Sequence, residues 1–172
     1  NRQAPMVISY RINAGNIPRD HWIQDPQDGG GRIIGEVCHF VDFCSALVDS
    51  AVTSVVANSI SSDRVDLVAH DSVVITIKYA DGSLVTVQYL AEGNKDLPKE
   101  RCEVFADGQS AVMDNFSTTT FFGGRKRFRE KNSKGFKEEL NAFVETCKKG
   151  GEWPIPWHSI VETHRVCFAA ID

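Results

Sequence analysis

Three side chains that could carry out acid–base chemistry follow a run of three glycines at positions 29–31. Arg32, Glu36 and His39 succeed the glycines at spacings of four and three residues. In a helix these spacings place side chains within about 60° of one another. A histidine, with an ordinary pKa near ~6.5, can accept or donate a proton at neutral pH. A carboxylate beside it could fix its tautomer, and Arg32 could neutralise that carboxylate or hold an acidic group of a ligand.

The segment that must position these side chains reads as one amphipathic helix. Its apolar residues recur at helical spacing on the side opposite the three polar ones. Because glycines carry no Cβ and adopt positive φ easily, a ligand could approach the main chain just before this helix. The residues predicted to face the core are Ile33, Ile34, Val37, Phe40, Val41, Cys44 and Val48.

The remainder of the chain is dominated by strand signals. Residues 5–14 alternate in polarity and 51–60 are rich in β-branched residues. Residues 72–92 contain two alternating runs joined by Asp81 and Gly82, a hairpin signature that recurs over 100–114, and 117–130 adds an edge strand. We therefore predict an α+β fold, a predominantly antiparallel, open-faced sheet of about six strands with helices packed on one face.

Two further helices are expected near the C-terminus, over 133–149 and 157–170. In the first, the side predicted to face the core consists of Phe136, Leu140, Phe143, Val144 and Cys147. In the second, it consists of Ile160, Val161, His164, Phe168 and Ile171.

The uncovered face of the sheet is open to two interpretations. If it carries Val74, Thr76, Val85, Val87 and Tyr89, it would favour association with a partner. If it is instead lined by Thr76, Lys78, Thr86 and Gln88, it would be a solvated face.

Composition excludes several classes of protein. The 172 residues suffice for one domain with its own core, and a net charge of −4 gives no reason to expect nucleic acid or a membrane surface as partner. The basic run 125–131 is short and is interpreted as a solvated edge. With no apolar run near ~20 residues and no signal-peptide pattern, the chain is expected to be cytoplasmic. Five cysteines without close pairs indicate buried small side chains rather than disulfides or a metal site.

A dinucleotide-binding fingerprint is absent from the sequence. No GxGxxG follows a strand and opens a helix, and the glycines at 29–31 follow a loop rather than a buried strand. Because the chain also begins with Asn1 rather than Met, we expect residues 1–172 to be a single C-terminal domain of a longer polypeptide.

The glycine run and the histidine eight residues after it resemble a motif of the glucose-fructose oxidoreductase, inositol dehydrogenase and rhizopine-catabolism (Gfo/Idh/MocA) family, in its C-terminal domain. His39 falls on the family's histidine. Gly35 falls where the family has an aspartate, and Glu36 is the nearest carboxylate. The resemblance covers nearly the whole chain, including the closing stretch WPIPWHSIVETHRVCFAAI, and is strongest to the branch found in bacterial polysaccharide-synthesis loci.

This resemblance implies the substrate-binding half of an NAD(P)-dependent oxidoreductase. The reaction would transfer a hydride between the nicotinamide and a hydroxyl of a sugar, nucleotide sugar or cyclitol. NAD or NADP would be bound mainly by an N-terminal Rossmann domain of the same polypeptide, so the chain alone would be inactive. Copies would associate through the open sheet as a homodimer or tetramer. The alternative is a non-catalytic dimerisation or sugar-binding module.

The same resemblance assigns candidate site residues. His39 and Glu36 are the catalytic candidates. Arg11 and Asn13 end the first strand and either touch substrate or belong to a solvated strand face. Trp22 either stacks on a sugar ring or covers the edge of the core, and a packing or capping role is favoured for His21. The full set of substrate-binding candidates is Arg11, Asn13, Trp22, Gly30, Gly31 and Arg32.

Overall fold

The fold was established from a computed structural model of the chain. It describes residues 2–61, 63, 68, 71–124, 129–131 and 134–171. Most of the basic run 125–131 and most of the loop 61–66 therefore lie outside the described residues.

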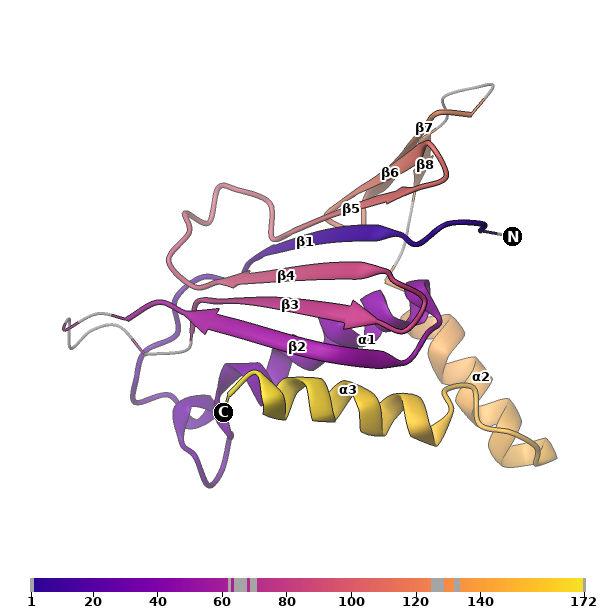
Figure 1. The fold of residues 1–172 in the computed structure, drawn as a ribbon. Helices are drawn as coiled ribbons and strands as arrows, with labels where there is room; N and C mark the ends of the chain where they lie inside the picture. The colour runs from indigo at the N-terminus through magenta and orange to yellow at the C-terminus, as the bar shows by residue number, and fades with distance from the viewer. Residues whose placement is uncertain are drawn as a thin grey trace.

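The centre of the molecule is one mixed sheet of eight strands, ordered β2-β3-β4-β1-β5-β6-β7-β8 (Figure 1). β1 pairs in parallel with β4, and every other neighbouring pair is antiparallel. The prediction of a predominantly antiparallel sheet is confirmed, whereas the expected strand count of about six was too low. The strands are β1 Val7–Asn13, β2 Val52–Ser59, β3 Val73–Tyr79, β4 Leu84–Leu90, β5 Glu100–Ala106, β6 Gln109–Asp114, β7 Thr118–Phe122 and β8 Arg129–Lys131.

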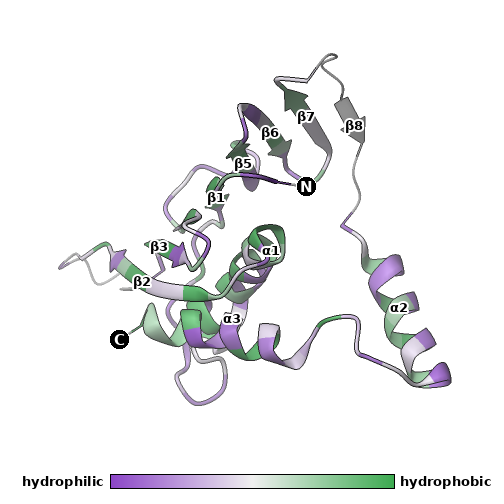
Figure 2. Ribbon diagram, turned by 45° about the vertical axis from the view of Figure 1, so that its right-hand side comes forward, coloured by the Kyte–Doolittle hydropathy of each residue, from purple (hydrophilic) through white to green (hydrophobic). Residues whose placement is uncertain are grey.

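The helices lie on one side of this sheet, as expected (Figures 1 and 2). α1 (Cys38–Val48) and α3 (Trp157–Ala169) pack against each other beneath the strands. The sheet side chains that face them are almost fully buried and form the core together with Val41, Cys44 and Val48 of α1. These sheet residues are Ile8, Tyr10, Ile12, Ile75, Ile77, Tyr79, Val85, Val87 and Tyr89.

The opposite sheet face differs from the apolar interpretation of the sequence. Val85, Val87 and Tyr89 are buried against the helices, and only Val74 and Thr76 of the predicted set lie on the open face. In β4 the residues that alternate with the buried Val85, Val87 and Tyr89 face the open side and are half-buried or exposed. They are Leu84, Thr86, Gln88 and Leu90. Alternation identified the two sets, but both contain apolar residues, so sequence alone did not settle which set meets the helices.

The helix after the glycines is not regular. Residues 33–37 form a π-helical turn, Ile33–Val37, which continues directly into α1. α1 ends at Asp49, whose backbone is left-handed with φ 53°. The predicted core side is largely correct, because Ile33, Val37, Phe40, Val41, Cys44 and Val48 are all buried.

α2 (Phe136–Lys149) contradicts its predicted packing. None of its residues is buried, and it stands apart from the sheet and the other helices (Figure 2). Its period was identified correctly, but within the described residues its apolar side is left largely exposed. The residues predicted to be core but found exposed are Phe136, Leu140, Phe143 and Val144, with Cys147 also exposed.

α3 is packed through a different side from the one predicted. His164, Phe168 and Ile171 are exposed, and the buried residues of the helix are Thr163, Val166 and Cys167. Two polar contacts fix this rotation. Glu162 Oε1 accepts a hydrogen bond from the amide of Val52 at 2.9 Å, and Thr163 Oγ1 donates to Asp42 of α1 at 3.3 Å.

The cysteines are all free. Cys44, Cys102 and Cys167 are buried as predicted, Cys38 is half-buried and Cys147 is exposed. Within the described residues, no three His, Cys, Asp or Glu side chains are grouped to hold a metal ion. No helix in that part of the chain is both long and apolar enough to cross a bilayer.

Candidate functional site

The three glycines have separate structural roles. A Cβ at Gly29 would lie 2.4 Å from Cα of Ile23, so only glycine fits against the short 3₁₀-helix η1 (Trp22–Gln24). Gly30 and Gly31 have φ of 67° and 82°, in the left-handed region that favours glycine. No atom lies within 4 Å of a Cβ built on Gly31, so its backbone is open on that side. The glycine run thus combines a tight loop with an uncovered stretch of main chain.

The π turn after these glycines carries Glu36 and delivers His39 to the surface. His39 is the second residue of α1 and is exposed, whereas Glu36 is half-buried. π turns insert one extra residue into a helix and occur frequently at functional sites. Gly35 lies inside this turn, and a Cβ there would make ordinary contacts, at 3.4 Å to Cδ1 and 3.6 Å to Cγ1 of Ile23 and at 3.8 Å to the carbonyl oxygen of Gly29. The lack of a carboxylate at position 35 is therefore not imposed by crowding.

Glu36 is surrounded by three hydrogen-bond or charge partners. Lys99 Nζ donates to Oε1 at 2.5 Å, the Tyr89 hydroxyl donates to Oε2, and a guanidinium nitrogen of Arg32 lies 3.6 Å from Oε2. Burial alone would raise the pKa of this carboxyl. The hydrogen bonds from Lys99 and Tyr89 and the two positive charges outweigh that effect and hold the pKa below its ordinary value. Glu36 is thus an ionised carboxylate rather than a proton donor at neutral pH.

Arg32 is the buried centre of this polar cluster, with 2% of its surface exposed. Its Nη1 donates to the carbonyl of Gly15 at 2.6 Å and lies 3.7 Å from Asp71, and its Cζ stands 4.9 Å from the ring centroid of Tyr89. Asp71 also accepts a hydrogen bond from Gln24 at 2.7 Å. Burial raises the pKa of Asp71 despite this bond and the nearby guanidinium. Arg32 therefore ties together the loop after β1, the π turn and the segment before β3.

Arg11 and Asn13 hold the loop that carries Lys99. Nη1 of Arg11 donates to the carbonyls of Pro98 at 2.7 Å and Lys99 at 3.3 Å. Nδ2 of Asn13 donates to the carbonyls of Asn94 at 2.7 Å and Leu97 at 3.0 Å, and its backbone amide donates to Lys99 O at 2.7 Å. Through these bonds the end of β1 fixes the β4–β5 loop so that Lys99 reaches Glu36.

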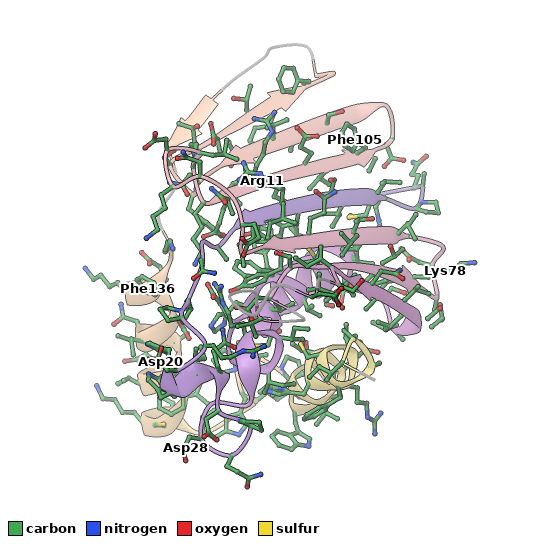
Figure 3. All side chains as sticks on the ribbon, turned by 90° about the vertical axis from the view of Figure 1, so that its left-hand side faces the viewer. Arg11, Asp20, Asp28, Lys78, Phe105 and Phe136 are labelled. Atoms are coloured by element: carbon green, nitrogen blue, oxygen red, sulfur yellow. The ribbon has the colours of Figure 1, made fainter. Side chains whose placement is uncertain are left out.

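The remaining sequence candidate, Trp22, lies on the surface. It belongs to η1 and is 64% exposed, which leaves its ring open to a ligand. Its neighbour His21 caps the same short helix, because its Nδ1 accepts a hydrogen bond from the amide of Ile23. Figure 3 shows Asp20 and Asp28 on this loop, below the strand that carries Arg11.

A small cavity adjoins the glycine loop. It has a volume of about 180 Å³, and its walls include Gln24, Gly30, Gly31, Arg32 and Asp71. The sequence candidates Gly30, Gly31 and Arg32 therefore meet around one space, whereas Glu36 and His39 are not among the residues that line it. Arg11 and Asn13 act on the neighbouring loop instead.

Three members of the cluster, Asp71, Tyr89 and Lys99, were not identified from sequence. Asp71 and Lys99 stand 35 and 63 residues after Glu36 in loops without a motif. Tyr89 occupied an ordinary alternating position of a strand, which indicated packing alone. A weak signal existed for Lys99, because it lies directly before a strand that pairs with the end of β1, where site residues were expected.

The fold and this site define an open-faced α+β domain that presents a glycine loop and a helix bearing an exposed histidine. The family model described as the GFO/IDH/MocA C-terminal domain matches residues 5–112. The chain belongs to this family. Among curated proteins, none matches the sequence significantly.

Solved structures with the same fold include several oxidoreductases. UDP-N-acetylglucosamine 3-dehydrogenase from Acidithiobacillus ferrooxidans superposes with a TM-score of 0.75 at 14% identity, covering 97% of this chain and 52% of that one. A dehydrogenase from Clostridium difficile gives 0.77 at 15%, covering 99% and 55%. Biliverdin reductase from Synechocystis, solved with biliverdin and NADP+, gives 0.76 at 12%, covering 98% and 54%.

These comparisons establish the fold and no more. Identities of 12–15% are too low to transfer an activity, and two of the three names, a UDP-N-acetylglucosamine dehydrogenase and a biliverdin reductase, already differ in the compound they refer to. This chain spans about half the length of each of them.

Proposed function

We propose that this chain is the substrate-binding half of an NAD(P)-dependent oxidoreductase that acts on a hydroxyl of a sugar, nucleotide sugar or cyclitol. The observations that carry the proposal are the exposed His39 and, three residues before it, a carboxylate kept ionised by Lys99, Tyr89 and Arg32. The structures of similar fold lend support, since they are named as dehydrogenases, oxidoreductases and a reductase.

In this reaction the nicotinamide, when bound, accepts or returns the hydride. A ring nitrogen of His39 takes the proton of the substrate hydroxyl during oxidation and returns it during reduction, which is the transfer that the cofactor does not perform. The negative charge of Glu36 stabilises the imidazolium that forms. The open backbone at Gly31 suits the close approach of a planar ring or a sugar.

The other candidate residues have supporting roles in this proposal. Arg32 is too buried to be a primary contact for substrate, so we assign it the positioning of Glu36 and of the Gly15 loop. Arg11 and Asn13 position Lys99. Trp22, which is exposed beside the glycine loop, is the group we assign to stacking on the substrate.

The cofactor would be held mainly by a Rossmann domain of the same polypeptide. The matched structures contain about as much chain again as this domain. We propose that residues 1–172 form the C-terminal half of such a protein and are inactive without the other half.

Copies of the protein would associate through the open sheet face. Val7 is exposed at the start of β1, and the register places it beside Leu84 on one side and Phe105 on the other, both also exposed. A row of apolar side chains across three strands favours a partner over water. A homodimer or tetramer is therefore part of the proposal.

The decisive test is turnover by the whole polypeptide, with a panel of sugars, nucleotide sugars and cyclitols and either nicotinamide. Replacing His39 by Asn should lower kcat by about 10²- to 10⁴-fold, the usual contribution of a general acid–base residue. His158→Asn, an exposed histidine at the start of α3, serves as the control and should leave turnover unchanged. Equal turnover of the wild type and the His39 variant would remove the acid–base role.

A second candidate function is a non-catalytic dimerisation or sugar-binding module, favoured by Gly35 at the position of the family's aspartate. The structure offers a direct discriminator, because position 35 has room for a side chain. In a module that has lost its chemistry, Gly35→Asp would create or raise turnover. If Glu36 has taken over the role of the family's aspartate, the same substitution would leave turnover equal or lower.

A further inference from the structure

A large apolar surface of the described chain lies on α2 and on the segment that joins it to α3. Phe136, Leu140 and Phe143 of α2 are 66%, 64% and 52% exposed. Trp153 and Trp157 beyond the helix are 55% and 74% exposed. With ~200 Å² for each aromatic side chain, the four exposed rings alone leave roughly 500 Å² of apolar surface uncovered. An apolar patch of this size on a folded chain indicates an interaction site.

The exposed aromatic side chains of this patch contact one another and line a groove. The rings of Phe143 and Trp153 stack with centroids 5.6 Å apart and an interplanar angle of 19°. Between α2 and the start of α3 lies a groove of about 580 Å³, lined by Leu140, Phe143, Trp153, Ile155, Trp157 and Ile160. We call this groove and the adjoining face of the helix the α2 surface. Its apolar side chains line one common groove rather than being exposed singly.

α2 is an amphipathic helix, with its apolar residues on this side and polar residues on the other. Its apolar residues recur at helical spacing, and its first and last turns carry Glu138, Glu139, Lys148 and Lys149, charges that favour the respective helix ends. A helix of this pattern gains most of its stability from packing its apolar side, and in the described chain that side has no cover.

The position of α2 limits what can cover it. α1, α2 and α3 all lie on the same side of the sheet (Figures 1 and 2). The exposed Val7, Leu84 and Phe105 alternate along their strands with residues buried against the helices, so they lie on the other face. A second copy bound to the open sheet would leave α2 bare. A domain that brings a nicotinamide to the exposed His39 on α1 must approach from the helix side, where α2 stands.

We propose that the α2 surface is the docking site of the dinucleotide-binding domain of the same polypeptide. The structures of similar fold are about twice as long as this chain, so that each contains a second body of similar size. This inference rests on the proposed function and deepens it, because it assigns a named surface to the contact between the two halves. By contacting the cofactor domain, α2 would hold that domain over the glycine loop.

The test compares amide hydrogen exchange in the whole polypeptide and in residues 1–172 alone. In the whole polypeptide, the amides of α2 should exchange at least about 100-fold more slowly than in the shorter chain, while those of β1 should be equally protected in both. The double variant Leu140→Asp, Phe143→Asp should abolish the extra protection. Asn141→Asp, on the polar side of α2, should not. Both sets of positions are exposed in this chain, so the variants do not disturb its core.

Each other result overturns the proposal. Equal, low protection of α2 in both proteins would show that the second domain does not cover it. Protection of α2 in residues 1–172 that rises with concentration would assign the surface to a second copy. Nicotinamide binding measured on the same whole polypeptide separates the docking proposal from the proposed oxidoreductase function. Binding with an unprotected α2 refutes the docking alone, and a protected α2 without binding refutes the oxidoreductase.

Discussion

Replacing Lys99 by Met should weaken the site in a way that depends on pH. Lys99 Nζ lies 2.5 Å from Glu36, and the side chains are 43% and 22% exposed. Because solvent screens a pair with this exposure, its contribution to the free energy of unfolding is at most about 1 kcal/mol, despite the short distance. The substitution also removes the largest of the effects that lower the pKa of Glu36, so that pKa should rise.

The sign of the pH dependence follows from the direction of the pKa. A carboxyl whose pKa is lowered by folding stabilises the protein above its unfolded pKa of about 4.3 and loses that contribution as pH falls through its folded pKa. The difference in unfolding free energy between wild type and Lys99→Met should therefore be about 1 kcal/mol at pH 7 and should vanish in acid.

Urea denaturation at a series of pH values measures this difference, and carbon-detected NMR of the glutamate carboxyls reports the pKa of Glu36 directly. Lys78→Met is a suitable control, since Lys78 is exposed and forms no ion pair with a carboxylate among the described residues. Its effect should not vary between pH 7 and acid. A Lys99 variant whose destabilisation is the same at both pH values, with an unchanged titration of Glu36, would refute the electrostatic account of the site.

Three more perturbations probe the remainder of the structure. Tyr89→Phe removes the hydroxyl that donates to Glu36 and should cost about 1.5 kcal/mol of unfolding free energy at pH 7, measured by urea denaturation. Ile75→Ala should cost about 2–5 kcal/mol, whereas Val74→Ala on the open face should cost under about 0.5 kcal/mol; equal costs would contradict the assigned faces of β3. Val7→Lys should convert a dimer or tetramer to a monomer in light scattering, and a wild type that is already monomeric at tens of micromolar would remove the sheet-face association.

Elements with a strong local signal were predictable from the sequence. The Asp81-Gly82 hairpin, the first strand and the helix after the glycines form where their periodicities place them. The core side of α1 was correct because its apolar residues sit together on one side of a single helix. What the pattern did not contain was the π turn at Ile33–Val37, which depends on the fit of the helix against the glycine loop rather than on side-chain period.

Errors arose where a pattern was correct but its surroundings were unknown. The apolar side of α2 is real, yet within the described residues it is exposed rather than packed in the core. One interpretation of the sequence placed Val85 and Val87 on the open face and the other placed Thr86 and Gln88 there, and because both sides of this strand are partly apolar the sequence left the choice open. The rotation of α3 depends on Glu162 reaching the amide of Val52, a contact between residues 110 positions apart.

The candidate site was predictable only along its helix. Arg32, Glu36 and His39 share a segment, so their spacing identified them together. Their partners come from other elements, and only the folded sheet brings Tyr89 and Lys99 to Glu36 and Asp71 to Arg32. The sequence also did not indicate that Arg11 and Asn13 are engaged with the loop of Lys99, because a polar strand end is compatible with either a ligand or a neighbouring loop.

The central claim is that this domain completes a nicotinamide-dependent oxidoreductase. The most direct measurement is a calorimetric titration of the whole polypeptide with NADH and NADPH, with residues 1–172 titrated in parallel. Saturable binding of at least one nucleotide to the whole polypeptide, and none to residues 1–172, is the predicted result. Failure of the whole polypeptide to bind either nucleotide would contradict the oxidoreductase assignment and would leave His39 without the hydride transfer that it is proposed to assist.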